Sequence, residues 1–366
     1  MIIEQGCRKA AFWHPCSFTK NLRTMPFIPE LLKLKTVSIV GTAKNTGKTE
    51  TLNYIIARLG EHVGYVCLTS IGVDGEKTDR VTQTEKPEVM IPEGMKFVTS
   101  ETHYRQKRLP AEILDVSTER TALGRLIVSR SHGNGKVLLS GPSTTGGLQK
   151  MIADMPRYGV ELTIVDGALS RLCPASPSVT EGMVLATGAA YSANMTELIR
   201  RTQYLHDLIK MPEIEDRSLA AMLSDVEQGM RVIASDGKVE DPGFMSALSA
   251  SAWKDTKWLK GVERLYVSGV ISDNLLERLR VMPDFKTLIV RDFTRVFADY
   301  KVFRRFIDSG HQVMSLYNTK LVAITINPMA PSGYRLDSDI LRDRLQESLQ
   351  IPVYDVRKLQ DASFKE

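Results

Sequence analysis

Short hydrophobic runs alternate with amphipathic stretches along the chain, and this alternation is the pattern of an α/β fold. A run at 35–41 (KTVSIVG) precedes a helical pattern at 48–59, and a second run at 63–69 (VGYVCLT) follows it. Strand, helix and strand in this order predict two parallel strands joined by a right-handed crossover.

The alternation continues to the C-terminus. We expect further strands at 160–167, 182–188, 231–235, 264–269, 286–292, 312–317 and 321–327, and helices at about 147–157, 194–210, 273–281, 299–309 and 338–349. Strands that are apolar throughout indicate a sheet that is buried on both faces. The predicted fold class is therefore α/β, with a doubly wound, mostly parallel sheet and helices on both faces.

Two stretches depart from this alternation. Residues 88–100 (EVMIPEGMKFVTS) hold two short apolar runs around Pro-Glu-Gly, which predict a small hairpin inserted at the sheet edge. The runs at 123–130 and 136–141 flank a glycine-rich segment and predict another pair of neighbouring strands.

The pattern divides the chain into three parts. Residues 1–32 are assigned to an irregular N-terminal extension, because their first stretch is basic and lacks a regular period. Residues 33–215 form the first α/β core. Residues 216–366 form a C-terminal α/β part, which we expect to continue the same sheet or to pack on it.

Composition narrows the class of protein. Of the 366 residues, 43% are hydrophobic and 25% are charged, as in globular proteins. No apolar run reaches the roughly 18 residues that a membrane span needs. The net charge of +5 is modest, and no dense Lys/Arg stripe carries interleaved aromatic residues, so neither a membrane nor a nucleic-acid partner is expected.

The four cysteines are too sparse for a disulfide scaffold, which favours the reducing cytoplasm. Cys7, His14 and Cys16 lie close together but lack the paired spacing of a zinc site, so free thiols are expected there. Cys67 falls inside a predicted buried strand.

The segment GTAKNTGKT at 41–49 has the features of a phosphate-binding loop. It follows a predicted strand and opens a predicted helix, whose N-terminus attracts anions. Small residues let backbone N–H groups point at phosphate oxygens, while a lysine and a threonine reach the phosphates and Mg²⁺. We therefore predict ATP and Mg²⁺ as ligands. The expected contacts are Gly41, Thr42, Asn45, Thr46, Gly47, Lys48, Thr49 and Glu50.

The length of this loop is unusual. Five residues separate Gly41 from Gly47, and Thr42 occupies the place of the first glycine of the common motif. The loop resembles the GTDTxVGKT loop of dethiobiotin synthetase and its relatives, with Ala43 in place of the aspartate. It is also similar to loops of the wider SIMIBI family of NTPases, whose extra lysine lies five residues before the second lysine. Lys44 lies only four before Lys48, so it is not given that role.

Two acidic residues are expected near the loop. Asp166 ends the hydrophobic run LTIVDGA and resembles the acidic residue of the EGAGG segment in the synthetases. Asp79 lies in KTDRVT, which resembles their NSDA region, while Asp74 and Glu76 remain alternatives at the metal. Lys48, Asp79 and Asp166 are the predicted catalytic residues, and Thr49, Asp79 and Asp166 are the predicted metal ligands.

Two further segments carry candidate contacts. SGPSTTGG at 140–147 is a second small, hydroxyl-rich loop, which either binds an anionic substrate group or only caps a helix. Its candidate contacts are Ser143, Thr144, Thr145 and Gly146. Asn327, at the end of the last long strand, resembles the base-recognising position of the synthetase family, since an amide can bond both edges of adenine.

Four segments together, GTAKNTGKT, CLTSIGVDGEKTD, VDGALSR and ITINPMAPSGY, resemble the reactivase subunits associated with lysine 5,6-aminomutase (KamB type). The resemblance implies an ATPase that remodels an adenosylcobalamin- and pyridoxal-dependent aminomutase, together with a second ATPase subunit. A homo-oligomer is also compatible with the sequence.

The alternative is an ATP-dependent ligase, carboxylase or kinase acting on a small molecule. The dethiobiotin synthetases carry a lysine on the second strand that meets the substrate carbamate, and this chain has no Lys or Arg between Glu61 and Glu76. We therefore expect no activity in biotin synthesis. For a remodelling ATPase, we expect residues 70–82 to act as a nucleotide-dependent switch.

Overall fold

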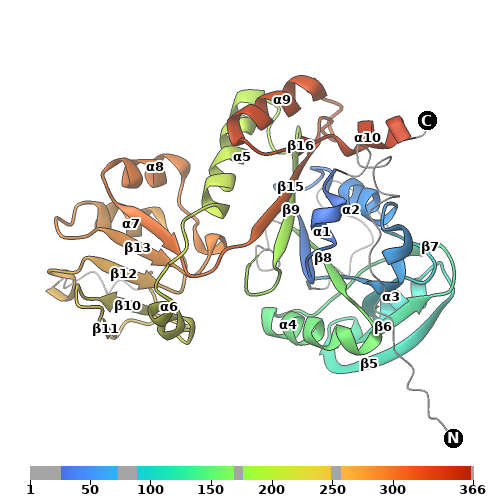
Figure 1. Ribbon diagram of the computed structural model, residues 1–366, viewed down its shortest axis with the longest axis horizontal. Helices are drawn as coiled ribbons and strands as arrows, with labels where there is room; N and C mark the ends of the chain where they lie inside the picture. Colours follow the sequence, from blue (N-terminus) through green and yellow to red (C-terminus); the bar gives the residue numbers. More distant parts are fainter. Residues whose placement is uncertain (1–25, 73–88, 169–175, 249–256, 364–366) are drawn as a thin grey trace, which may run out of the picture.

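The computed structural model describes residues 26–72, 89–168, 176–248 and 257–363. The protein is α/β, with a large, mostly parallel sheet that is flanked by helices (Figure 1). The spatial order of its nine strands is β16 (Val353–Tyr354), β15 (Lys320–Asn327), β9 (Gly182–Gly188), β1 (Thr36–Gly41), β8 (Leu162–Ala168), β2 (Val66–Ser70), β4 (Lys96–Ser100), β6 (Gly124–Ser131) and β5 (Ala111–Thr121). The first seven run parallel, whereas β6 is antiparallel to both of its neighbours, β4 and β5.

Helices cover both faces of this sheet. They are α1 (Ile28–Leu31), α2 (Lys48–Ile56), α3 (Glu101–Gln106), α4 (Thr145–Asp154), α5 (Met195–Ile209), α9 (Ser338–Leu349) and α10 (Val356–Ser363). The alternation within β1 shows how the layers form. Val37 and Ile39 belong to the cluster with α1 and α2, while Val40 packs with α5 and α9. A strand buried on both sides needs this continuous apolar sequence.

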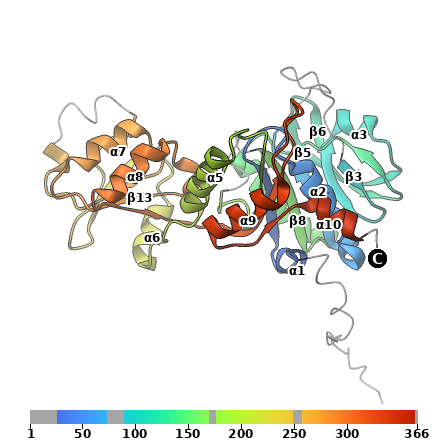
Figure 2. The same cartoon turned by 90° about the horizontal axis from the view of Figure 1, so that it is seen from above.

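A second, five-stranded sheet forms the lobe at the left of Figure 1. Its spatial order is β11 (Val239–Glu240), β10 (Met230–Ile233), β12 (Arg264–Val267), β13 (Thr287–Val290) and β14 (Gln312–Ser315), with α6 (Arg217–Ser224), α7 (Asp273–Arg280) and α8 (Tyr300–Asp308) around it. In the described ranges, the 3-10 helices are η2 (Gly60–Tyr65), η3 (Met155–Tyr158), η7 (Lys257–Leu259) and η8 (Phe293–Arg295). Figure 2 shows α5 between this lobe and the large sheet.

Residues 216–366, expected to continue the same sheet or to pack on it, divide between the two sheets. Only residues between α5 and β15 build the second sheet, and the chain then returns to the first sheet through β15 and β16. The hydrophobic pattern locates the strands but does not say which sheet each one joins, so an insertion and a continuation look alike in the sequence.

The two irregular stretches also differ from expectation. The hairpin predicted for 88–100 does not form, because β3 (Val89–Ile91) pairs with β7 (Gly135–Val137), while β4 joins the large sheet beside β2. The predicted pair 123–130 and 136–141 does not form either, since β6 pairs with β4 and β5. Strand β5 was not expected, because its charged residues hide the strand pattern of an exposed edge.

The predicted N-terminal extension ends earlier than residue 32. Residues 1–25 lie outside the described part of the chain, but Phe27, Ile28 and Leu31 are buried in the core with α2. The Phe27 ring lies 5.7 Å from the Tyr54 ring and 5.2 Å from the Tyr354 ring, measured between centroids. Among the described residues, no helix is long and apolar enough to cross a membrane.

This packing predicts the cost of removing one ring. Phe27→Ala should lower the free energy of unfolding by about 3–5 kcal/mol, because it leaves a cavity between three helices and the sheet. Denaturant titration followed by circular dichroism measures this loss. The matched control is Phe297→Ala, because that side chain is 63% exposed and should cost little. Equal losses in the two variants would show that the segment before β1 is not part of the core.

Candidate phosphate-binding site

The candidate site lies where parallel strands of the large sheet end. Strand β1 lies between β8 and β9, and all three run in the same direction. Their carboxyl ends therefore meet at one edge, which is where open α/β sheets bind ligands. The loop 41–47 leaves β1 at this edge and leads directly into α2.

The loop has a conformation that few residues adopt. Asn45 has φ 62° and Gly47 has φ 92°, both in the left-handed region. A Cβ atom on Gly47 would also lie 2.8 Å from the Asn327 Cβ atom. Thr46 is buried, and its hydroxyl donates a hydrogen bond to the Ala43 carbonyl at 2.9 Å. The glycine is therefore required both by the backbone angle and by the close contact.

The N-terminus of α2, like those of α1 and α7, has no side-chain cap, whereas most other helix starts in the described part of the chain have one. Side chains accept hydrogen bonds from the first turns of α4, α5, α6, α8 and α9. The N-cap of α2 is Gly47, which offers no such side chain. The backbone N–H groups of its first turn are therefore available to an anion, as the prediction of a phosphate site requires.

Lys48 and Asp166 form an ion pair across this edge. The Lys48 ammonium lies 2.8 Å from Asp166 Oδ1, and the two side chains are 25% and 21% exposed. Apart from this pair, the buried Oδ1 atom receives no hydrogen bond from the described residues. The neighbouring strand also helps to fix this position, because the Ser70 hydroxyl donates to the Asp166 carbonyl at 3.0 Å. A cation and a carboxylate with spare lone pairs thus lie beside the open helix start.

The oxygen atoms that the protein offers at this position would suit Mg²⁺ only together with a phosphate ligand. Asp79, Asp74 and Glu76 lie outside the described residues, so their position relative to Asp166 stays a prediction. Within the described ranges, no group of three His, Cys, Asp or Glu residues could hold a metal ion. Mg²⁺ commonly binds through one or two carboxylates plus phosphates and water, which fits Asp166 together with Thr49, the residue after its partner Lys48.

The second candidate loop lies at the same edge. The N–H of Gly72, two residues after the end of β2, donates to the Pro142 carbonyl at 2.8 Å. A Cβ atom on Gly141 would lie 1.6 Å from the Ser70 carbonyl oxygen, so the two backbones touch. Thr144 caps α4 by accepting from the Gly147 N–H at 3.1 Å. The loop therefore caps a helix, which is one of the two roles expected for it beside the binding of an anionic substrate group.

Other members of this loop remain accessible. Ser143 and Thr144 are exposed, and Thr145 is half-buried. A Cβ atom on Gly146 would meet nothing within 4 Å. Since β2 is the direct neighbour of β8, these groups share the edge that carries Asp166.

A buried polar cluster behind this loop was not expected from the sequence. His103 Nδ1 lies 2.5 Å from the Ser140 hydroxyl, which in turn lies 3.2 Å from the Ser100 hydroxyl. All three side chains are buried. Ser100 and Ser140 each precede a segment that leaves the sheet, but they are 40 residues apart in the sequence. No local sequence pattern indicates this contact. It arises only in the folded protein, where the end of β4 and the segment before Gly141 lie side by side.

Asn327 lies against the loop 41–47. Its side-chain amide donates to the Asn45 carbonyl at 3.1 Å, and its Oδ1 accepts from the Met329 N–H at 3.2 Å. Thr325, two residues earlier on the same strand, lies 2.7 Å from the Thr51 hydroxyl of α2. The sequence indicated Asn327 as a candidate but gave no reason to select Thr325 or Thr51.

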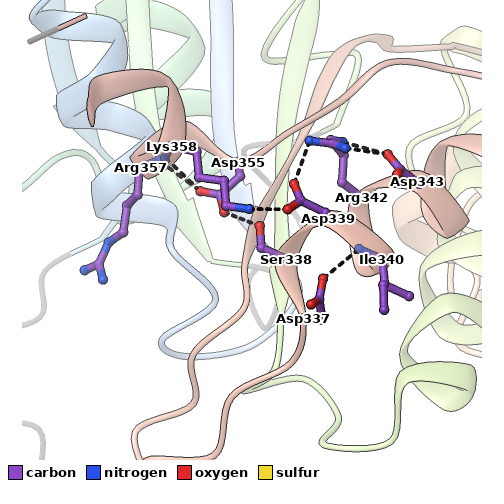
Figure 3. Close-up of polar contacts among 9 residues, drawn as sticks. All are labelled: Asp337, Ser338, Asp339, Ile340, Arg342, Asp343, Asp355, Arg357 and Lys358. Atoms are coloured by element: carbon purple, nitrogen blue, oxygen red, sulfur yellow. Dashed lines mark hydrogen bonds and ion pairs between the residues drawn. The ribbon is translucent and has the colours of Figure 1, made fainter. Parts of the chain in front are cut away.

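Glu50, a predicted nucleotide contact, is held by the C-terminal helix. Its carboxylate lies 2.8 Å from the guanidinium of Arg357 on α10. Figure 3 shows how α10 is fixed. The buried Asp355 caps it and accepts from the Ser338 hydroxyl of α9, while Lys358 reaches Asp339 at 2.7 Å. The Arg357 side chain points away from this group.

Cys67, the single cysteine among the described residues, is not a reactive thiol. Burial raises the pKa of Cys67 to about 12, although the ammonium of nearby Lys96 opposes the shift. Its sulfur therefore stays a protonated thiol at neutral pH, and β2 supplies no thiolate nucleophile to the site. The prediction that Cys67 lies in a buried strand is confirmed.

Comparison of the chain with models of protein families, with curated proteins and with solved structures finds no match. The interpretation of this edge therefore rests on the geometry of the residues themselves and on the sequence resemblances given above.

The loop 140–147 yields a matched pair of variants. Gly141→Ala should lower the melting temperature by several degrees, because its methyl group would collide with the Ser70 carbonyl. Gly146→Ala lies in the first turn of α4 with free space around it, so it should leave stability unchanged or raise it by about 0.5–1 kcal/mol. Differential scanning calorimetry gives the melting temperatures of the two variants and of the unaltered protein. A stable Gly141→Ala protein would contradict the close contact between the two loops.

Proposed function

We propose that the protein is a P-loop ATPase that binds ATP and Mg²⁺ at residues 41–49. The observation that carries this proposal is the 2.8 Å pair between Lys48 and Asp166, formed beside a helix start that no side chain caps. A lysine in the first turn and a carboxylate at the end of the adjacent parallel strand are the two charges that phosphate and Mg²⁺ require.

The roles of the residues follow from their charges. The Lys48 ammonium and the backbone N–H groups of the loop would hold the phosphates, and the low exposure of the pair strengthens these contacts relative to open water. Asp166 and the Thr49 hydroxyl would hold Mg²⁺, which neutralises charge on the phosphates. Gly47 lets the backbone approach the ligand closely.

A finer proposal concerns the work that ATP hydrolysis drives. We infer from the four resembling sequence segments that the protein remodels a cobalamin-dependent aminomutase. Its support is that resemblance and the lack of Lys and Arg on β2, where a small-molecule ligase of the synthetase type has its carbamate-binding lysine. Turnover of ATP by the protein, measured alone and with a lysine 5,6-aminomutase, tests this; an unchanged rate would favour the small-molecule enzyme.

The first test of the phosphate site removes the lysine. Lys48→Ala should weaken ATP·Mg²⁺ binding about 10- to 150-fold, because a charge-assisted hydrogen bond contributes roughly 1.5–3 kcal/mol. Isothermal titration calorimetry gives both affinities. Lys286→Ala is the matched control, since it breaks a Lys–Glu pair of 2.9 Å in the second lobe. Unchanged ATP affinity in Lys48→Ala would remove the basis of the proposal.

The second test changes the carboxylate. Asp166→Asn keeps the side-chain shape but removes the negative charge that pairs with Lys48 and would attract Mg²⁺. We expect ATP hydrolysis to fall and the gain in affinity from Mg²⁺ to shrink, while binding of Mg²⁺-free ATP is retained or improved. Titrations with and without EDTA separate these effects. If Mg²⁺ strengthens ATP binding equally in both proteins, Asp166 is not at the metal.

A further inference from the structure

Strand β15 touches the phosphate loop although it is not a neighbour of β1. Strand β9 lies between them, and it carries Ala186 and Gly188 opposite Thr325 and Asn327. A Cβ atom on Gly188 would lie 2.0 Å from the Asn327 carbonyl oxygen. The absence of a side chain there lets the end of β15 lie closely against the end of β9.

Asn327 makes three contacts that fix its orientation. Its Nδ2 donates to the Asn45 carbonyl at 3.1 Å, and its Oδ1 accepts from the Met329 N–H at 3.2 Å. Its Cβ atom lies against Gly47, so closely that a Cβ atom there would be 2.8 Å away. The side chain is therefore directed at the two residues of the loop that have positive φ.

Thr325, two residues before Asn327 on β15, makes a second contact that holds the loop region against this strand. Its hydroxyl lies 2.7 Å from that of Thr51, and the Thr51 hydroxyl also lies 3.1 Å from the Gly47 carbonyl. Both threonines are 1% exposed, so these bonds form away from water. The contacts of Asn327 and Thr325 hold the end of the loop and the start of α2 against the same strand.

The loop needs such support because its backbone is strained. A non-glycine residue in the left-handed region, such as Asn45 at φ 62°, costs roughly 1 kcal/mol and keeps that conformation only when its surroundings favour it. A hydrogen bond to the Asn45 carbonyl fixes the peptide that follows this residue. Phosphate binding depends on N–H groups that already point inward before the ligand arrives.

We propose that Asn327 is a positioning residue that holds the phosphate loop in its binding conformation, and not a residue that recognises the base. The proposal rests on the proposed function of the loop. It assigns to Asn327 a contribution that is the same for every triphosphate, whatever base is attached.

The experiment compares three ligands on two asparagine variants. Asn327→Ala is titrated with the Mg²⁺ complexes of ATP, GTP and inorganic tripolyphosphate, and its affinities are divided by those of the unaltered protein. The same fold loss for all three, between about 2- and 13-fold, is expected from the removal of one neutral hydrogen bond. Asn318→Ala, which removes an amide bond of 3.0 Å to the Met211 carbonyl outside the site, should change none of them.

A loss confined to ATP would overturn the proposal and make Asn327 a base contact. Unchanged affinity for all three would overturn it as well. Thr325→Val sharpens the comparison, because a buried hydroxyl on β15 cannot touch a base. The fold loss of affinity in this variant should therefore also be the same for the three ligands.

Hydrogen exchange of the ligand-free protein provides a readout that does not depend on nucleotide binding. Amides 45–48 should exchange faster in Asn327→Ala than in Asn318→Ala, and equal rates would contradict the positioning role. If the unaltered protein binds none of the three ligands, the proposed function fails, while the exchange rates still decide whether Asn327 holds the loop.

Discussion

The parallel pairing of β1 with β8 on one side and β9 on the other is the constraint on which the site depends. It places the ends of three strands at one edge, so that residues more than 100 positions apart become neighbours. Lys48 follows the central strand and Asp166 ends the adjacent one, and their pair is a direct consequence of this order. The two charges would not be partners if β1 and β8 were not neighbours.

Close backbone contacts are the second requirement of this edge. Gly47, Gly141 and Gly188 each stand where a Cβ atom would meet another segment within 3 Å. Gly47 lies against the Asn327 side chain, Gly141 against the Ser70 carbonyl and Gly188 against the Asn327 carbonyl. An edge assembled in this way presents backbone N–H groups and a few polar side chains, which is the surface that a phosphate-bearing ligand requires.

The sequence predicted local features well and pairings poorly. The strand at 182–188 and the helix at 338–349 have the predicted ends, because their hydrophobic periods are clear and Gly188 and Asp337 mark the boundaries. The pairing of β3 with β7 was missed, because contact between residues about 45 positions apart leaves no local signal.

The candidate site shows the same division. The loop 41–49 and Asp166 were found from their own residue types, because strand, glycine and acid occur together in the sequence. Thr51 and Thr325 were not found, since a threonine within a helix or a strand is ordinary and only the three-dimensional fold places their hydroxyls 2.7 Å apart.

The attachment of the second lobe has a mechanical consequence. The chain enters the lobe next to Met211 and leaves it next to Asn318, and the Asn318 amide bonds the Met211 carbonyl at 3.0 Å. Only residues 316–319 separate β14 from β15. Few residues are therefore free to act as a hinge between the lobe and the large sheet, and the exit connection continues directly into β15, whose far end contacts the loop 41–47.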